Sequence, residues 1–351
     1  MTHRATVGEA LSARGVSRRN LVKFCAAMAS LLALPADMRQ VFAQALAQAQ
    51  RPSVIWLPFQ ECTGCTESLT RSSQPSVESL LFDLVSLDYQ ETLMAASGHQ
   101  AEEIRLNTMK ANKGKYILII DGSVATGEGG AYSCIGGATN EQWLRDAAQD
   151  AAAIVCVGTC SSFGGLPEAN PNPTRAVPVS AIVKDKPIVK VPGCPPIPAV
   201  ITGVLAHFLA FGILPELDPL GRPKAFYGET IHDRCYRRPF YDQGRFAKSF
   251  DDAGARNGWC LYELGCKGPT TYNACATVKW NGGTSYPIQS GHGCFGCSEP
   301  RFWDAQSFYD PLPTVQWGSA ATVAGAAAAG IALGAVAAAT ARRRQQNSEK
   351  E

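Results

Sequence analysis

Short apolar runs alternate with amphipathic stretches along roughly the first 220 residues of the chain. Uninterrupted apolar runs predict strands that are buried on both faces. The stretches 141–150 and 199–211 lie between such runs and predict helices. This alternation is typical of an α/β protein with a parallel sheet covered by helices. The predicted strands are 53–58, 82–87, 116–120, 153–157 and 187–191.

The pattern changes from about Gly221. Strand and helix periodicities fade, and glycine, proline, tyrosine and tryptophan become frequent, as in Arg237-Arg238-Pro239-Phe240. A segment this irregular is poorly suited to fold on a hydrophobic core alone, and bound metal would supply the missing cross-links. We therefore predict one domain over 50–220 and a second over 221–312.

The N-terminal end has the pattern of an export signal. Arg18-Arg19 precedes an uncharged run from Phe24 to Leu34, and small residues follow from Ala43 to Ala49. These features predict a twin-arginine signal peptide over 1–49, with several A-x-A cleavage sites in its last part. The alternative is an amphipathic N-terminal helix.

The C-terminal end contains a second long uncharged stretch. Residues 318–341 carry no charged side chain and are followed by Arg342-Arg343-Arg344. At ~1.5 Å per residue, a helix of this length would cross a hydrocarbon core of roughly 30 Å. We predict a transmembrane helix over 318–341, a cytoplasmic tail over 342–351 and a folded body on the periplasmic side of the cell membrane. The alternative is a flexible alanine-rich tail.

Composition adds one unusual feature, the cysteines. With 46% apolar and 18% charged residues the chain is otherwise ordinary, and no basic stripe with interleaved aromatics points to a nucleic-acid partner. Ten of the 13 cysteines lie in short motifs, most of them flanked by glycine or proline. So many thiols suit several iron–sulfur centres, which transfer electrons. The ten are Cys62, Cys65, Cys160, Cys194, Cys235, Cys260, Cys266, Cys275, Cys294 and Cys297.

Four of these cysteines follow the carboxyl ends of predicted strands. Ligands bind at that edge of a parallel sheet, so thiolates from three loops would converge there. Four is also the ligand number of a 4Fe–4S cluster. The four are Cys62 and Cys65 after the first strand, Cys160 after the fourth and Cys194 after the fifth.

Seven motifs occur in one order along the chain. They are Glu61-Cys62-Thr63-Gly64-Cys65-Thr66-Glu67-Ser68, Ser86-Leu87-Asp88-Tyr89, Gly158-Thr159-Cys160, Pro171-Asn172-Pro173-Thr174, Val191-Pro192-Gly193-Cys194-Pro195-Pro196, Leu264-Gly265-Cys266-Lys267-Gly268-Pro269 and Gly293-Cys294-Phe295-Gly296-Cys297-Ser298-Glu299-Pro300. With these motifs the chain, from Arg51 to about Tyr309, resembles the small subunit of membrane-bound periplasmic nickel–iron hydrogenases. The resemblance implies a flavodoxin-like parallel-sheet domain and a small, irregular iron–sulfur domain ahead of the transmembrane helix.

The resemblance also implies the cofactors, which are two 4Fe–4S clusters and one 3Fe–4S cluster. Pro287 corresponds to the family proline that stands in place of a fourth medial ligand, which leaves a three-iron centre. The implied ligands are Cys62, Cys65, Cys160 and Cys194 for the proximal 4Fe–4S cluster, His232, Cys235, Cys260 and Cys266 for the distal 4Fe–4S cluster, and Cys275, Cys294 and Cys297 for the medial 3Fe–4S cluster.

The function implied by the resemblance is electron transfer in a heterodimeric hydrogenase. Electrons would pass from a nickel–iron site on the large subunit, through the three clusters, to a cytochrome b-type membrane subunit or another quinone-linked acceptor. This chain would contribute no catalytic residue. Gly64 and Gly165 occupy the positions at which oxygen-tolerant relatives add cysteines, which implies a proximal cluster with four cysteines.

Three alternative interpretations follow from the same residues. The cysteines could form disulfides, or His232, Cys235, Cys260 and Cys266 could hold one zinc ion. The chain could be the related single-cluster subunit of a quinone reductase, although such a subunit lacks the region from His232 to Cys297. A complete hydrogenase would need two further paired-cysteine motifs for nickel, which the chain does not contain.

Glu61 could serve proton transfer or a plain structural hydrogen bond.

Overall fold

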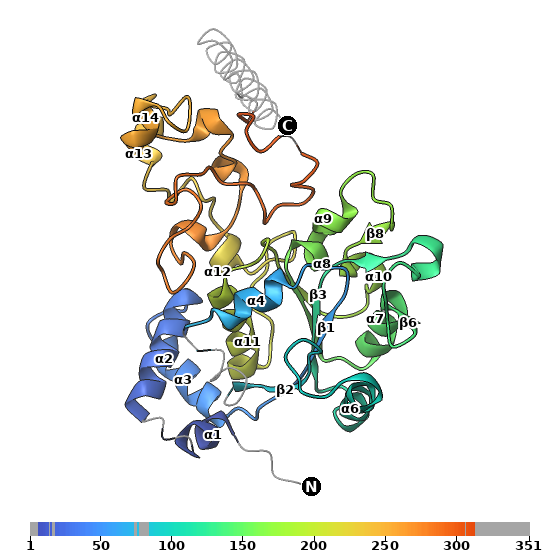
Figure 1. Cartoon of the computed structure of the whole chain (residues 1–351). Helices are drawn as coiled ribbons and strands as arrows, with labels where there is room; N and C mark the ends of the chain where they lie inside the picture. Colours follow the sequence, from blue (N-terminus) through green and yellow to red (C-terminus); the bar gives the residue numbers. More distant parts are fainter. Residues whose placement is uncertain are drawn as a thin grey trace, which may run out of the picture. The chain divides into compact units, whose positions relative to one another are not determined.

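Five parallel strands form the central sheet of the computed structural model, which describes residues 6–13, 15, 18–73, 76, 84–305 and 307–312. Their order is β2-β1-β3-β7-β9, and every neighbouring pair is parallel (Figure 1). Taken in sequence, this is the 2-1-3-4-5 order of flavodoxin-like sheets. The strands are β1 (Ser53–Pro58), β2 (Ser86–Tyr89), β3 (Ile117–Asp121), β7 (Ala153–Val157) and β9 (Ile188–Val191).

The sequence prediction of a parallel α/β sheet is confirmed. The first and fourth predicted strands have the observed bounds, and the third and fifth each start one residue later. The second strand starts at Ser86 rather than at 82, and residues 82–83 lie outside the described residues. This strand is at the edge of the sheet and is only partly buried, so its apolar pattern is the weakest guide to its position.

Side chains of the strands alternate between two apolar layers. Val54 and Trp56 of β1 pack in the layer that contains α11, whereas Ile55 and Leu57 pack in the opposite layer. In Figure 1, α6, α7 and α10 lie on one side of the sheet and α4 and α11 on the other. These helices are α4 (Gly64–Thr70), α6 (Gly98–Ala111), α7 (Asn140–Gln149), α10 (Val179–Ile182) and α11 (Pro198–Phe211).

Local sequence signals explain the two most regular helices. Helix α7 begins after Thr139, whose hydroxyl accepts a hydrogen bond from the Gln142 N–H, and it buries Trp143 against the sheet. Helix α11 has Pro198 at its first position and ends at Gly212, which adopts the left-handed conformation. Since α11 is apolar almost throughout, it must be covered on more than one side.

Three N-terminal helices provide part of that cover. They are buried with α11 in one apolar cluster, in which the rings of Phe42 and Phe211 lie 5.7 Å apart. They fall within the predicted signal peptide, whose removal stays a prediction. The helices are α1 (Val7–Ala13), α2 (Arg18–Leu31) and α3 (Met38–Gln48).

Beyond residue 221 the described helices are all short. The domain boundary near 220 stays a prediction, since the described residues up to Asp310 form one compact unit.

The described helices beyond residue 221 are α12 (Lys224–Tyr227), α13 (Arg238–Asp242), α14 (Ala253–Arg256) and 3-10 turns at Tyr262–Leu264, Gly268–Thr270 and Ala274–Ala276. Elsewhere lie α8 (Thr159–Phe163), α9 (Gly165–Glu168), a 3-10 turn at Gly127–Gly130 and the short pairs β4 (Val124–Ala125) with β8 (Ala176–Val177) and β5 (Cys134–Ile135) with β6 (Ala138–Thr139).

The prediction of a transmembrane helix requires correction. In the part of the chain that the structure describes, no helix is both long and apolar enough to cross a bilayer. Helix α11 is the most apolar of the longer ones, but its 14 residues would span only ~21 Å of a hydrocarbon core of roughly 30 Å. Residues 318–341 and 342–351 lie outside the described residues. We therefore withdraw the single C-terminal span and the location at the cell membrane that was predicted from it.

Candidate metal centres

The first four predicted ligands come together at the carboxyl edge of the sheet, Cys62 and Cys194 on loops, Cys65 in α4 and Cys160 in α8. The thiol of Cys65 interacts electrostatically with those of Cys160 and Cys194, and the thiol of Cys194 also interacts with that of Cys62. These positions follow β1, β7 and β9, as the sequence predicted. Four sulfur donors from three segments therefore face one small region.

Glycines allow the backbone to approach these thiols closely. A Cβ on Gly158, whose φ is +91°, would lie 2.5 Å from the Cys65 sulfur, and one on Gly165 would lie 2.7 Å from the Cys160 sulfur. A Cβ on Gly64 would lie 3.1 Å from the Cys62 sulfur. Side chains at the first two positions would occupy the space around the thiols, so the glycines fit a bulky group held there.

Asp121 is a buried carboxyl beside this group that the sequence analysis did not identify. It ends β3, one residue beyond the predicted strand, and is wholly buried. Burial, and then the charge of nearby Glu61, raise the pKa of Asp121 to about 8. The carboxyl is therefore neutral at neutral pH and adds no negative charge beside the four predicted thiolate ligands. Its place at the carboxyl end of a central strand was the available signal.

The predicted medial ligands line a cavity of about 540 Å³. Cys275, Cys294 and Cys297 contribute to its wall, and Pro287 lines the same cavity. Cys194, which belongs to the proximal group, lines it as well. The proximal and medial groups therefore meet at one space.

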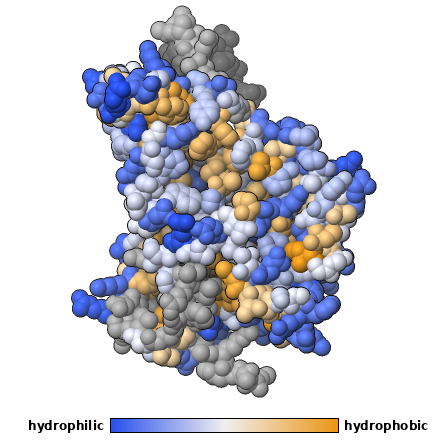
Figure 2. Space-filling view, viewed as in Figure 1, coloured by the Kyte–Doolittle hydropathy of each residue, from blue (hydrophilic) through white to orange (hydrophobic). Residues whose placement is uncertain are grey.

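Apolar residues gather in patches on the face of the molecule shown in Figure 2.

The predicted distal ligands surround a second, much smaller cavity. His232, Cys235, Cys260 and Cys266 all line it. Burial, and then the positive charge of Arg238, lower the pKa of His232. The imidazole is therefore neutral at neutral pH, which is the form that coordinates a metal.

The donor set fits polynuclear clusters better than one ion or disulfides. All 13 cysteines are described, and all are free thiols. Among the described residues, no three His, Cys, Asp or Glu side chains come close enough to hold a single metal ion. The donors line cavities instead, and a cluster is held by ligands spread around it.

Burial also determines the protonation of these thiols. Since desolvation opposes the thiolate, the pKa of a buried cysteine rises, to about 12 for Cys275. Metal ions must then displace protons from the sulfurs and neutralise the buried charge. Among the predicted ligands, the cysteines whose pKa is raised mainly by burial are Cys65, Cys160, Cys194, Cys260, Cys266, Cys275, Cys294 and Cys297.

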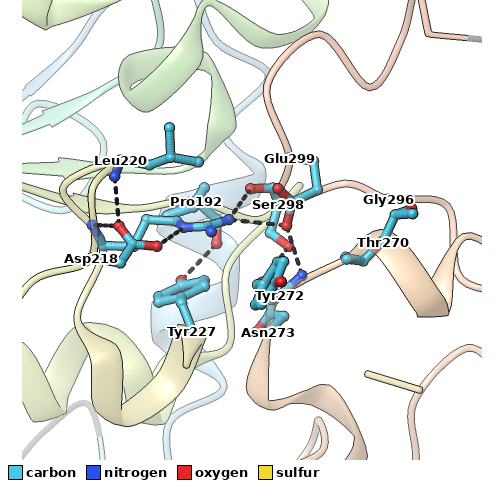
Figure 3. A network of polar contacts seen from close by, with 12 residues as sticks. Pro192, Asp218, Leu220, Tyr227, Thr270, Tyr272, Asn273, Gly296, Ser298 and Glu299 are labelled. Atoms are coloured by element: carbon cyan, nitrogen blue, oxygen red, sulfur yellow. Dashed lines mark hydrogen bonds and ion pairs between the residues drawn. The ribbon is translucent and has the colours of Figure 1, made fainter. Parts of the chain in front are cut away.

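A buried arginine connects the chain before and after residue 221 (Figure 3). The Arg222 side chain is 4% exposed and pairs with Asp218 at 2.7 Å and with Glu299 at 2.9 Å. Its guanidinium also donates to the Ser298 carbonyl, next to Cys297. Sequence analysis missed Arg222 because its second carboxylate partner is 77 residues away.

Comparisons with known proteins agree with this arrangement. Residues 227–310 match the family model for the C-terminal part of the NiFe/NiFeSe hydrogenase small subunit, and residues 62–208 match that of the NADH ubiquinone oxidoreductase 20 kDa subunit. The uptake hydrogenase small subunit of Azotobacter vinelandii is 49% identical over 99% of both chains. The Hydrogenase-1 small chain of Escherichia coli is 45% identical over 99% of this chain and 96% of its own.

Solved structures give the same result. The Ni-Fe-Se hydrogenase of Desulfomicrobium baculatum superposes with a TM-score of 0.71 at 35% identity, over 75% of this chain and 100% of the matched one. The fold and the grouped cysteines define an iron–sulfur electron-transfer protein. The chain belongs to the small subunits of nickel–iron hydrogenases, and it is the electron-transfer subunit that pairs with a large subunit.

Gly158→Ala should disturb the proximal group. The new methyl would press on the Cys65 sulfur, so we expect the heterodimer to lose about four irons per small subunit. Iron analysis with protein quantification measures this. Gly283→Ala is the matched control, because Gly283 has a φ of +90° with no atom near its Cβ position, and it should suffer backbone strain only. Equal iron in both variants would contradict the prediction.

Arg222→Met should destabilise the heterodimer. The variant leaves two carboxylates without their buried partner, and we expect a loss of about 3 kcal/mol in unfolding free energy, seen as a lower urea midpoint. Arg145→Met removes an exposed pair with Glu141 and should cost under about 1 kcal/mol. If the two variants unfold at the same urea concentration, Arg222 does not have this role.

Proposed function

We propose that this chain holds a proximal 4Fe–4S, a medial 3Fe–4S and a distal 4Fe–4S cluster on the eleven predicted ligands. The observation that supports this most is their grouping into three neighbouring sets along the molecule. When bound, these clusters would carry single electrons between the large subunit's nickel–iron site and an external acceptor. The protein residues hold the clusters, compensate their charge and exclude water.

Pro287 supports the three-iron assignment for the medial centre. It lines the cavity with the three cysteines and offers no ligand atom. Tyr286, the preceding residue, donates instead to the Cys235 sulfur of the distal group at 3.8 Å. The segment therefore contributes to the wall of the medial site and supports the distal one.

The distal group suits an electron exit. His232 is partly exposed, and exposed residues follow it at Asp233 and Arg234. We propose that a cytochrome b-type subunit or another quinone-linked acceptor docks near this end.

We also propose that residues 1–49 are a twin-arginine signal, which would allow export after the cofactors are inserted.

The two proposed domains share the clusters. The matched ranges, 62–208 and 227–310, leave a gap that includes residue 220, in agreement with a boundary there. The proximal ligands belong to 50–220, and the medial and distal ligands to 221–312.

Apolar patches on the face in Figure 2 support a large hydrophobic interface with the large subunit, as obligate complexes have.

Iron content tests the cluster assignment. The purified heterodimer should contain about eleven irons per small subunit, in addition to iron of the large subunit. Cys62→Ser, Cys260→Ser and Cys275→Ser should each remove the signal of one cluster in electron paramagnetic resonance, and a different one in each case. Zinc in the small subunit, or about four irons in total, would contradict the proposal.

His232→Cys tests the distal group. A thiolate in place of a neutral imidazole makes the cluster more negative, so its midpoint potential should fall. Iron content should stay at the native level, and transfer from hydrogen to a quinone-linked acceptor should slow. Redox titration followed by electron paramagnetic resonance measures the potential. An unchanged distal potential with full iron would exclude His232 as a ligand.

A further inference from the structure

Two proposed ligands bring their backbone beside a sulfur of the neighbouring group. The backbone amide of Cys194, in the proximal group, favours the thiolate of Cys297, in the medial group. The N–H of Cys294, in the medial group, donates to the sulfur of Cys266, in the distal group, at 3.3 Å. The ligand segments of neighbouring groups are therefore in contact at both junctions.

Thr159 holds the first of these contacts from both sides. Its hydroxyl accepts a hydrogen bond from the Gly193 N–H at 2.9 Å and donates to the Cys297 carbonyl. One hydroxyl contact is therefore on Gly193, the residue before Cys194. The other is on Cys297 itself. The Thr159 side chain is 1% exposed, and both contacts are therefore shielded from water.

Neighbouring residues hold the same two segments in place. The Tyr227 hydroxyl donates to the Pro192 carbonyl at 2.7 Å, and the Arg222 guanidinium lies over the Tyr227 ring while it binds Ser298 and Glu299 (Figure 3). These contacts position the segments more broadly. Among the contacts described above, only the Thr159 hydroxyl contacts both Gly193 and Cys297.

We propose that Thr159 is a positioning residue that holds the Gly193-Cys194 segment against Cys297 and so couples the proximal and medial centres. The inference rests on the ligand assignment of the proposed function. Hydrogen bonds to cluster sulfurs stabilise the reduced, more negative state and raise the potential. Without the hydroxyl, the buried Gly193 N–H and Cys297 carbonyl lose their partner, and the segments separate.

Thr159→Val in the whole heterodimer tests this inference. The variant keeps the shape and removes the hydroxyl, so iron content should stay native while the medial midpoint potential shifts downward. The distal potential should not move. Hydrogen-driven dye reduction should show a lower kcat at unchanged KM for hydrogen, because hydrogen binds to the partner. Thr159→Ser keeps the hydroxyl and should restore the native potential.

Thr202→Val is the matched control, since Thr202 is equally buried but its hydroxyl bonds within α11. A medial potential in Thr159→Val equal to that of native enzyme and of this control would overturn the proposal. If Thr159→Val fails to assemble, Thr159→Ala, which also lacks the hydroxyl, decides: a downward shift of the medial potential supports the proposal, and a native potential overturns it. Iron analysis of the native heterodimer tests the ligand assignment separately.

Discussion

Buried negative charge is the constraint on which the rest of this structure depends. Burial disfavours charge on eight of the ten proposed thiolate ligands, as the raised pKa values of Cys65 and Cys294 show. Burial keeps the Asp121 carboxyl protonated, so this residue adds no further negative charge, and the neutral imidazole of His232 stands where a further thiolate would add one. Iron must supply the main compensation, and the free energy of metal binding thereby becomes folding free energy for a segment with only short helices.

The parallel sheet solves the geometric part of this problem. Its carboxyl edge collects loops from distant parts of the sequence, and glycines such as Gly158 let backbone atoms approach the sulfurs. This edge fixes the proximal group together with helices that start there, since Cys65 lies in α4 and Cys160 in α8. The medial group then uses the same edge, because Cys194 and Cys275 line one cavity.

Sequence analysis could predict the features that depend on local pattern. Strands such as 153–157 are continuous apolar runs, and the cysteines stand in recognisable motifs, so the sheet and the candidate ligands were predictable. Arg222 and Thr159 were not, because their partners lie far along the chain and ordinary arginines and threonines are exposed. The stretch 318–341 was interpreted from its length, its missing charges and the arginines that follow it, and length without strong apolarity is a weak basis for a membrane span.

The same contacts that join the two halves of the chain also join the proposed centres. Arg222 links Asp218, before the predicted boundary, to Glu299, which lies two residues after Cys297. Thr159 links the proximal loop to Cys297 itself. The second half cannot dock correctly unless these buried polar groups find their partners, since each unpaired group would cost free energy. Correct docking therefore sets the spacing of the proximal and medial centres, and fold stability and electron transfer depend on one set of hydrogen bonds.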